Sequence, residues 1–217
     1  MQRSALVVTA AMLTCGVARA GCEPQWELFP NGFDKEVRTF AVVHGQLHAG
    51  GRFDMANGAS ARSIAVWTGG VFDNLGLGLV WNFGPQHCDA ITPFGDGLAA
   101  GGSFIRAGTT EATNFAIWSP PDWSELGDSS YFVTVAGEPR SMITIREDGK
   151  ETLYVGGAGL HRWTGSAWEP AGPNGEIEAL TTFDDGQGES LYLARTLGAS
   201  SASVERRDPV TGLWASI

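Results

Sequence analysis

Acidic side chains are the residues of this sequence that come nearest to a catalytic pattern. Asp54 and Glu111 each follow a glycine pair. Two carboxylates roughly 5 to 10 Å apart across one cavity are the arrangement that cleaves glycosidic bonds. A carbohydrate-active enzyme is therefore one hypothesis. The adjacent Asp184 and Asp185 lack the spacing and the distal glutamate of a calcium loop, so we interpret them as turn residues.

Other catalytic signatures are missing from the sequence. It contains no G-x-S-x-G, no H-E-x-x-H and no nucleotide-binding loop. The four histidines, at positions 44, 48, 87 and 161, are scattered without ligand spacing. We therefore predict no catalytic residue, no metal and no cofactor, and we favour a protein that is not an enzyme.

Several aromatic and charged residues lie in connections that are expected to form one face of the molecule. Trp81 and Tyr131 have no counterparts elsewhere in the chain, and such exceptions are where a binding site is grafted onto a regular framework. Local packing of the loops is the alternative explanation. The predicted ligand-binding set is Trp81, Phe83, His87, Tyr131, Phe132, Arg52, Asp54 and Glu111.

A repeat underlies the regular framework. The segments LHAGGRF, LAAGGSF and LYVGGAG begin at Leu47, Leu98 and Leu153, and each is followed by a segment that ends in tryptophan. The first two copies stand 51 residues apart, since 98 − 47 and 118 − 67 give the same difference. Repetition of this kind is typical of solenoids, propellers and arrays.

Four strands are predicted in each repeat. The first strand alternates small and large residues in every copy, which is the period of two that strands show. Asp-Gly turns lead into the strand with the glycine pair, and two rows of aromatic residues recur in the third and fourth strands. We assign these rows to the core, with carbohydrate stacking as the alternative. The rows are Trp67, Trp118 and Trp163, then Phe72, Trp123, Trp168 and Trp214.

Four such units describe an all-β fold of the β-propeller type, with about four four-stranded repeats. The units are expected at approximately 37–76, 88–127, 139–171 and 177–217, with an extra N-terminal strand near 26–29. The fourth unit departs from the pattern, because Ala194 and Arg195 replace the glycine pair and Arg207 replaces the third-strand tryptophan. Terminal repeats are commonly atypical.

The motifs AGG-x-F, I-A-x-W and W-x-x-L-G resemble those of secreted bacterial propeller proteins related to kelch and galactose-oxidase central domains, and of the fungal cell-polarity marker propeller. The resemblance covers nearly the whole mature chain. It implies a rigid platform for binding. The copper ligands of galactose oxidase are not matched.

Closure of the ring is left open by the sequence. Trp26 to Phe29 looks like one strand too many, because the fourth unit has its own last strand near Trp214. We favour a closed four-unit propeller in which the N-terminal strand packs against the last unit. The alternative is an open array or a piece of a larger propeller, whose unpaired edges would associate.

Export is predicted from the first twenty residues. A positive start, an apolar stretch and the sequence Ala18-Arg19-Ala20 are typical of a signal peptide, so residues 21–217 would form the mature, secreted protein. Acylation at Cys22 is the weaker alternative, because Arg19 occupies a position where a lipobox needs an aliphatic residue. No later segment is apolar enough to span a membrane.

Cysteine usage and net charge restrict the partners. Cys22 and Cys88 could form a disulfide after export, although Cys88 also falls in a column of small apolar residues, which suggests a buried side chain instead. The net charge of −10 argues against a nucleic-acid partner. The most economical prediction is a secreted, non-enzymatic binding or scaffold module for a protein or a glycan.

Overall fold

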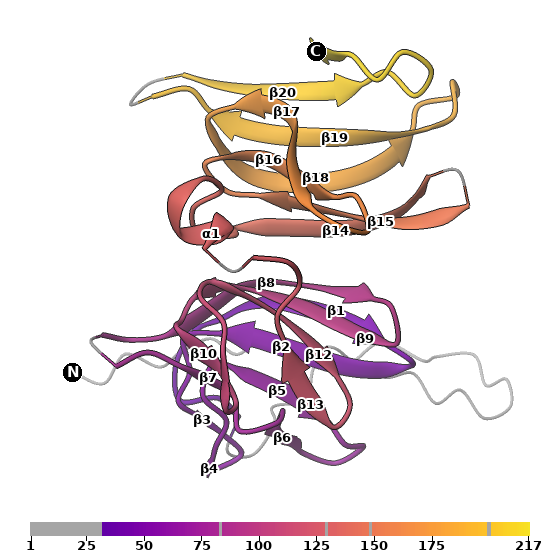
Figure 1. The fold of residues 1–217 in the computed structure, drawn as a ribbon. Coiled ribbons are helices and arrows are strands. Elements are labelled where there is room, and N and C mark those ends of the chain that lie inside the picture. Colours follow the sequence, from indigo (N-terminus) through magenta and orange to yellow (C-terminus); the bar gives the residue numbers. More distant parts are fainter. Residues whose placement is uncertain (1–31, 83, 129, 148, 199–200) are drawn as a thin grey trace, which may run out of the picture.

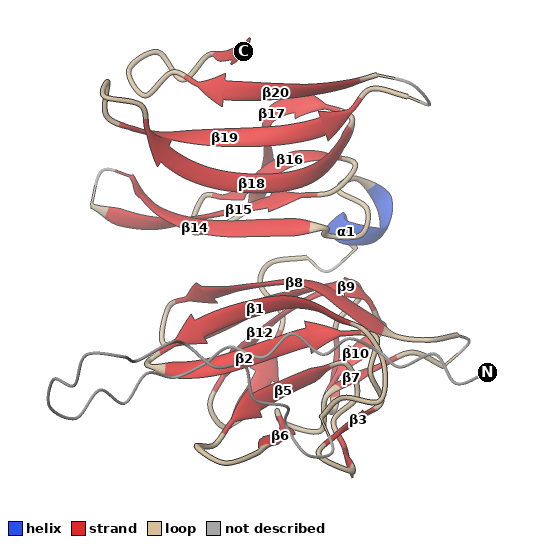
Figure 2. Cartoon of the chain, turned by 180° about the vertical axis from the view of Figure 1, so that it is seen from behind, coloured by secondary structure: helices blue, strands red, loops and turns tan. Residues whose placement is uncertain are grey.

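The protein is built almost entirely of β-strands. The computed structural model describes residues 32–217 except 83, 129, 148, 199 and 200. The only helix among them is the single turn α1 (Tyr131–Thr134). The predicted signal peptide, the strand near 26–29 and Cys22 lie outside the described residues. An all-β, propeller-like fold was predicted and is confirmed (Figures 1 and 2).

Four antiparallel sheets of four strands form the framework, and within each the strands follow one another in chain order. We call these sheets units 1 to 4. Unit 1 consists of β1 (Val37–Val43), β2 (Gln46–Gly51), β5 (Ile64–Trp67) and β6 (Phe72–Asn74). Unit 2 consists of β8 (His87–Phe94), β9 (Gly97–Ser103), β12 (Phe115–Ser119) and β13 (Asp122–Ser124).

The second half of the chain repeats this plan. Unit 3 consists of β14 (Ser141–Glu147), β15 (Lys150–Gly156), β16 (Gly159–Trp163) and β17 (Trp168–Asn174). Unit 4 consists of β18 (Glu176–Asp184), β19 (Glu189–Thr196), β20 (Ala202–Arg207) and β21 (Trp214–Ser216). Two small sheets decorate the first half: β3 (Met55–Ala56) with β4 (Ala59–Ser60), and β7 (Leu79–Val80) with β10 (Arg106–Ala107) and β11 (Thr110–Glu111).

The first strands of the four units lie side by side in the order β1, β8, β14, β18. Figures 1 and 2 show β1 and β18 on opposite sides of the neighbouring strands β8 and β14, so the row is open. The closed four-unit ring that we favoured from the sequence is therefore not formed, and the open arrangement is the one observed. Among the described residues, contacts between the first strands join each unit to the next one along the chain, as in repeat proteins.

Each sheet has two faces with different partners. We call the face that carries the third- and fourth-strand aromatic residues the front, and the opposite face the back. The front of unit 2, with Ile91 and Trp123, packs on the back of unit 1, with Val43 and Ile64. Units 3 and 4 pack in the same way on units 2 and 3. Three successive front-to-back junctions thus form the core.

The first glycine of each pair allows these faces to approach closely. A Cβ on Gly101 of unit 2 would lie 2.5 Å from Pro139 Cβ of unit 3, and a Cβ on Gly156 of unit 3 would lie 2.6 Å from Ile177 Cγ2 of unit 4. Real Cβ atoms do not come so near to a neighbour, because the atoms would overlap. The glycine column is therefore a packing requirement of the junctions.

Fourth-strand tryptophans tie each unit to the one before it. Trp123 Nε1 donates a hydrogen bond to Gly76 O at 3.1 Å, Trp168 Nε1 to Leu126 O at 2.8 Å, and Trp214 Nε1 to Ala171 O at 3.2 Å. Trp123 and Trp168 are buried, as predicted for core residues, whereas the third-strand tryptophans are half-buried. At each junction, burial of the indole ring and the hydrogen bond of its N–H group together stabilise the contact between the units.

Candidate functional site

Three of the predicted binding residues lie between β7 and the start of β8. Trp81 directly follows β7 and is half-buried. Phe83 lies outside the described residues. His87 begins β8, and its Nδ1 atom lies 2.9 Å from Asp89 Oδ2. Arg38 of unit 1 also binds Asp89. Burial acts to raise the pKa of Asp89, but His87 and Arg38 together hold it below its usual value.

Tyr131 and Phe132 lie on α1, where their contacts are those of packing residues. Phe132 is fully buried and stacks on Phe115, with ring centroids 4.7 Å apart. Tyr131 is half-buried, and its hydroxyl lies 2.7 Å from Nδ1 of His161 in unit 3. Burial lowers the pKa of His161. This helical turn therefore seals the junction of units 2 and 3.

The charged members of the predicted set belong to unit 1 and to the small sheets. Arg52 is exposed, and Glu111 is exposed at the end of β11. Asp54 forms an ion pair with Lys35 and accepts a hydrogen bond from Gln86 Nε2 at 2.9 Å. Among the described residues, no hydrogen bond or ion pair joins Asp54 to Glu111. These two carboxylates are thus not joined directly.

Cys88 is a free thiol in the core. It is completely buried, and its Sγ would lie 2.9 Å from a Cβ placed on Gly50. Burial strongly raises the pKa of this thiol, so it stays protonated and unreactive. Its environment is that of the small buried hydrophobe that the column pattern suggested.

A polar pocket of about 450 Å³ lies between the back of unit 3 and the front of unit 4. A volume of this size suits a small ligand. Its walls come from the ends of β14 and β18, the start of β19, and the loop 209–212. Charged and hydroxyl-bearing side chains dominate the lining, notably Arg146, Glu147, Arg162, Glu189, Arg207 and Thr211.

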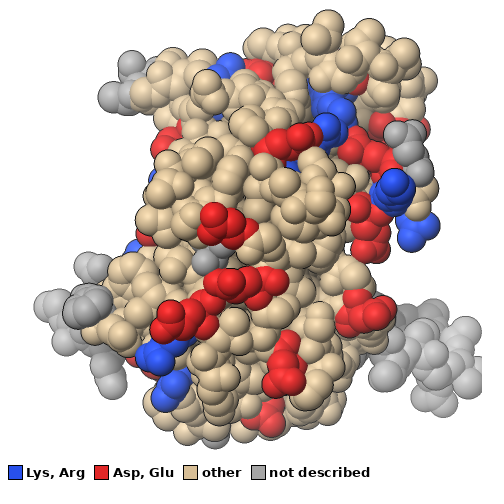
Figure 3. Space-filling view, in the orientation of Figure 1, with Lys and Arg blue, Asp and Glu red and all other residues tan. Residues whose placement is uncertain are grey.

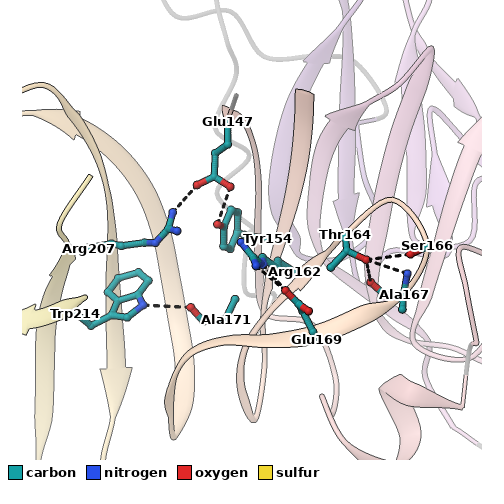
Figure 4. Close-up of polar contacts among 10 residues, drawn as sticks. All are labelled: Glu147, Tyr154, Arg162, Thr164, Ser166, Ala167, Glu169, Ala171, Arg207 and Trp214. Atoms are coloured by element: carbon teal, nitrogen blue, oxygen red, sulfur yellow. Dashed lines mark hydrogen bonds and ion pairs between the residues drawn. The ribbon is translucent and has the colours of Figure 1, made fainter. Parts of the chain in front are cut away.

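A partly buried network that includes the lining residues Glu147 and Arg207 lies at this pocket (Figure 4). Glu147 binds the guanidinium of Arg207 with one carboxylate oxygen and accepts the hydroxyl of Tyr154 at 2.9 Å with the other. The Arg207 guanidinium carbon lies 5.9 Å from the centre of the Tyr154 ring, within reach of a cation–π interaction. Burial, with the nearby Glu147 carboxylate, raises the pKa of Tyr154.

A second ion pair fixes another wall. Arg162 Nε donates to Glu169 Oε1 at 2.7 Å, and its Nη2 lies 2.6 Å from the same oxygen. The hydrogen bond to Glu169 raises the pKa of Arg162. Figure 4 shows this pair between Tyr154 and the turn that holds Thr164 and Ala167. The guanidinium of Arg162 is thus held in place at the wall of the pocket.

The loop over the pocket is ordered by its own carboxylate. Asp208 accepts the backbone N–H groups of Val210 at 2.9 Å and Thr211 at 2.7 Å. The bond from Thr211 is the main reason that the pKa of Asp208 lies below its usual value. This turn places Thr211 and Gly212 at the rim.

Arg207 is the residue that makes this junction different. It stands in the column of Trp67, Trp118 and Trp163, so the front of unit 4 presents a cation where the other units present an indole. Sequence reasoning noted the substitution only as a sign of an irregular last unit and did not predict the pocket. The replacement of a repeated aromatic residue by a charged one was the available signal.

The face shown in Figure 3 carries acidic side chains at several places and basic side chains in smaller groups. No group of three or more potential metal-ligating side chains occurs within the described part of the chain. Its single helical turn is also too short to cross a membrane. A scan against models of known protein families and a search of curated proteins found no significant match.

Proposed function

We propose that this protein is a secreted, non-enzymatic binding module and that its ligand is a glycan held in the pocket between units 3 and 4. The supporting observation is that this pocket lies at the one junction where arginine replaces the repeated tryptophan. The repeat motifs and the all-β framework support a rigid platform of the kelch-like kind.

The chemistry of the walls favours a polar ligand. Guanidinium, carboxylate and hydroxyl groups form hydrogen bonds with sugar hydroxyls. A planar guanidinium or carboxylate group can form two such hydrogen bonds at once. Because Arg162 and the Arg207–Glu147 pair are already fixed by protein partners, little side-chain entropy is lost when a ligand binds. A preorganised polar pocket therefore suits a short oligosaccharide.

The alternative remains a carbohydrate-active enzyme. Glu147 and Glu189 line the same cavity, which is the feature such an enzyme needs. Glu147, however, is bound to both Arg207 and Tyr154, so both of its carboxylate oxygens already have protein partners. This contact favours binding over hydrolysis.

A glycan array followed by calorimetric titration of the best oligosaccharide tests the proposal. Arg146 is exposed and lines the pocket, so Arg146→Ala should weaken binding by roughly tenfold without affecting the fold. The matched control is Arg52→Ala, an exposed arginine of unit 1 that belongs to the loop set predicted from the sequence.

Three results would contradict the proposal. Loss of binding in Arg52→Ala but not in Arg146→Ala would move the site to the loop face. Release of sugar products during incubation would establish the enzyme instead. If no glycan on the array binds, the ligand is not a glycan.

A further inference from the structure

The back of unit 4 keeps the apolar residues of a junction, yet no unit packs on it in the part of the chain that the structure describes. One column of the third strands shows this, because its members stand opposite the first glycine of each pair or, in unit 4, opposite Ala194. The column holds Ile64, Phe115, Leu160 and Val204. The first three are buried at the junction with the following unit, whereas Val204 is 47% exposed.

A column of the first strands gives the same contrast. It holds Val43, Phe94, Ile145 and Phe183. The first three pack against the following unit, but Phe183 is 60% exposed. Beside it lies the half-buried Tyr192, with the two ring centroids 6.1 Å apart. An apolar and aromatic patch of this kind marks an interaction surface.

Ala194 indicates that this surface does not receive a fifth unit in the geometry of the internal junctions. It occupies the glycine column, where a Cβ on Gly101 or Gly156 would lie 2.5 or 2.6 Å from an atom of the following unit. The methyl group of Ala194 would overlap the first strand of a further unit in the same way. Two sheets that pack face to face at the ordinary spacing of about 10 Å have room for such a methyl group.

The front of unit 1 is not available to cover this surface in a second copy, because residues of the chain itself pack on it. The Phe33 ring centroid lies 4.5 Å from that of Phe53 and 4.8 Å from that of Phe72. Ala49 and Ala65 are completely buried in the same cluster. Two copies can instead use one surface twice, which is an isologous contact.

The charges on the back of unit 4 suit an isologous contact. Asp185 follows β18 and Arg206 lies in β20, and Arg206 Nε is 3.2 Å from Asp185 Oδ2. The strand between them is β19. A two-fold axis along β19 therefore places β18 of each copy over β20 of the other. Each Asp185 then faces an Arg206 of the other copy, and like charges stay apart.

We propose that two copies of this chain form a two-fold dimer through the backs of their fourth units. Phe183, Tyr192 and Val204 lie at the centre of the contact, and the Asp185 and Arg206 side chains lie beside it. An apolar centre with aromatic residues and a charged surround is the usual composition of a protein interface. The polar pocket is lined by the front of unit 4, so it stays open in this dimer.

Sedimentation equilibrium of the purified protein and its variants tests the proposal. Val204→Glu places a carboxylate at the centre of the contact, so it should weaken dimerisation at least about 100-fold. Val133→Glu makes the same change at a 59% exposed position of α1, outside unit 4, and should dimerise as the wild type does. Circular dichroism establishes that each variant is folded before association is measured.

Charge reversal tests the two-fold arrangement. Asp185→Arg alone and Arg206→Asp alone each place like charges opposite one another, so each should weaken dimerisation about tenfold. An equimolar mixture of the two variants restores opposite charges at both positions. It should therefore form a heterodimer that is at least about tenfold tighter than either variant alone.

Three results would overturn the proposal. One is a wild-type protein that is monomeric at millimolar concentration. Another is a Val204→Glu variant that dimerises as tightly as the wild type, because the contact would then lie elsewhere. The third is a mixture of the charge variants that associates no more tightly than each variant alone. The glycan measurements are independent of these outcomes, since the pocket is not part of the contact.

Discussion

At the scale of single residues, the junction of units 3 and 4 replaces an apolar contact by a polar network. Arg207 takes the place of a tryptophan, and Glu147 and Tyr154 of unit 3 meet its guanidinium. Partly buried charges of this kind are stabilising only as long as every partner is present. Removing one member leaves the others without partners.

Glu147→Ala should lower the free energy of unfolding by about 1–3 kcal/mol, because Arg207 and the Tyr154 hydroxyl both lose their acceptor. Glu111→Ala, which removes an exposed carboxylate, is the control and should change it by less than about 0.5 kcal/mol. Urea denaturation measures both. Equal effects would show that the network contributes nothing to the junction.

His161 should make stability depend on pH. Burial lowers its pKa below the ordinary value of 6.5, so the unfolded chain takes up the proton more readily than the folded protein. The contribution of His161 to stability is therefore fully present above pH 6.5 and is lost as the pH drops below that value. His161→Gln should show a shallower decrease between pH 7.5 and 5 in urea denaturation, whereas the exposed His44→Asn should follow the wild type. An unchanged slope in His161→Gln would contradict this assignment.

At the scale of elements, the units are held together by repeated positions. In units 2 to 4, the tryptophan near the start of the fourth strand lies on the front face and donates a hydrogen bond to the preceding unit. The first glycine of the pair allows the following unit to approach closely. These two columns explain why the motif recurs. In each column, the residue type is required by contact with a neighbouring unit rather than by the sheet to which the residue belongs.

Trp123→Ala should destabilise the protein by about 3–5 kcal/mol, as expected for a large buried aromatic residue. Trp81→Ala, at a half-buried loop position, should cost much less. Thermal and urea denaturation of the two variants give the comparison. Small and equal losses would show that the tryptophan column does not hold the junctions together.

Gly101→Ala tests the close approach of units 2 and 3. The new methyl group would overlap Pro139, so we expect a loss of about 1–3 kcal/mol. Gly70→Ala is the control, since no atom lies within 4 Å of the corresponding Cβ. A neutral Gly101→Ala would mean that the junction can widen without cost.

The repeat made the strands and the tryptophan column predictable, because both follow from residues that recur at fixed positions. The small sheet of β7, β10 and β11 was not predicted, although β10 and β11 repeat β3 and β4 at the same spacing of 51 residues, since 106 − 55 and 110 − 59 both give 51. Strands of two residues are too short to show an alternation of apolar and polar residues. The polar pocket was missed for a different reason: its walls come from two units, and only the three-dimensional junction brings Arg146, Glu189 and Thr211 together. The sequence pattern also did not predict that the row of units is open. The repeated residues determine how neighbouring units pack, but they do not determine the curvature of the whole row.

At the scale of the whole molecule, the open row of units holds a polar pocket at one of its junctions. The pocket lies at an internal junction, so it is complete within one copy of the chain.

The most direct test of the account is NMR mapping of the best glycan from the array on the isotope-labelled protein. We predict that backbone amide shifts concentrate at residues 189–191 and 211–212, which line the pocket between units 3 and 4. Shifts concentrated instead at Trp81, His87 and Tyr131 would contradict it and place the site on the loop face.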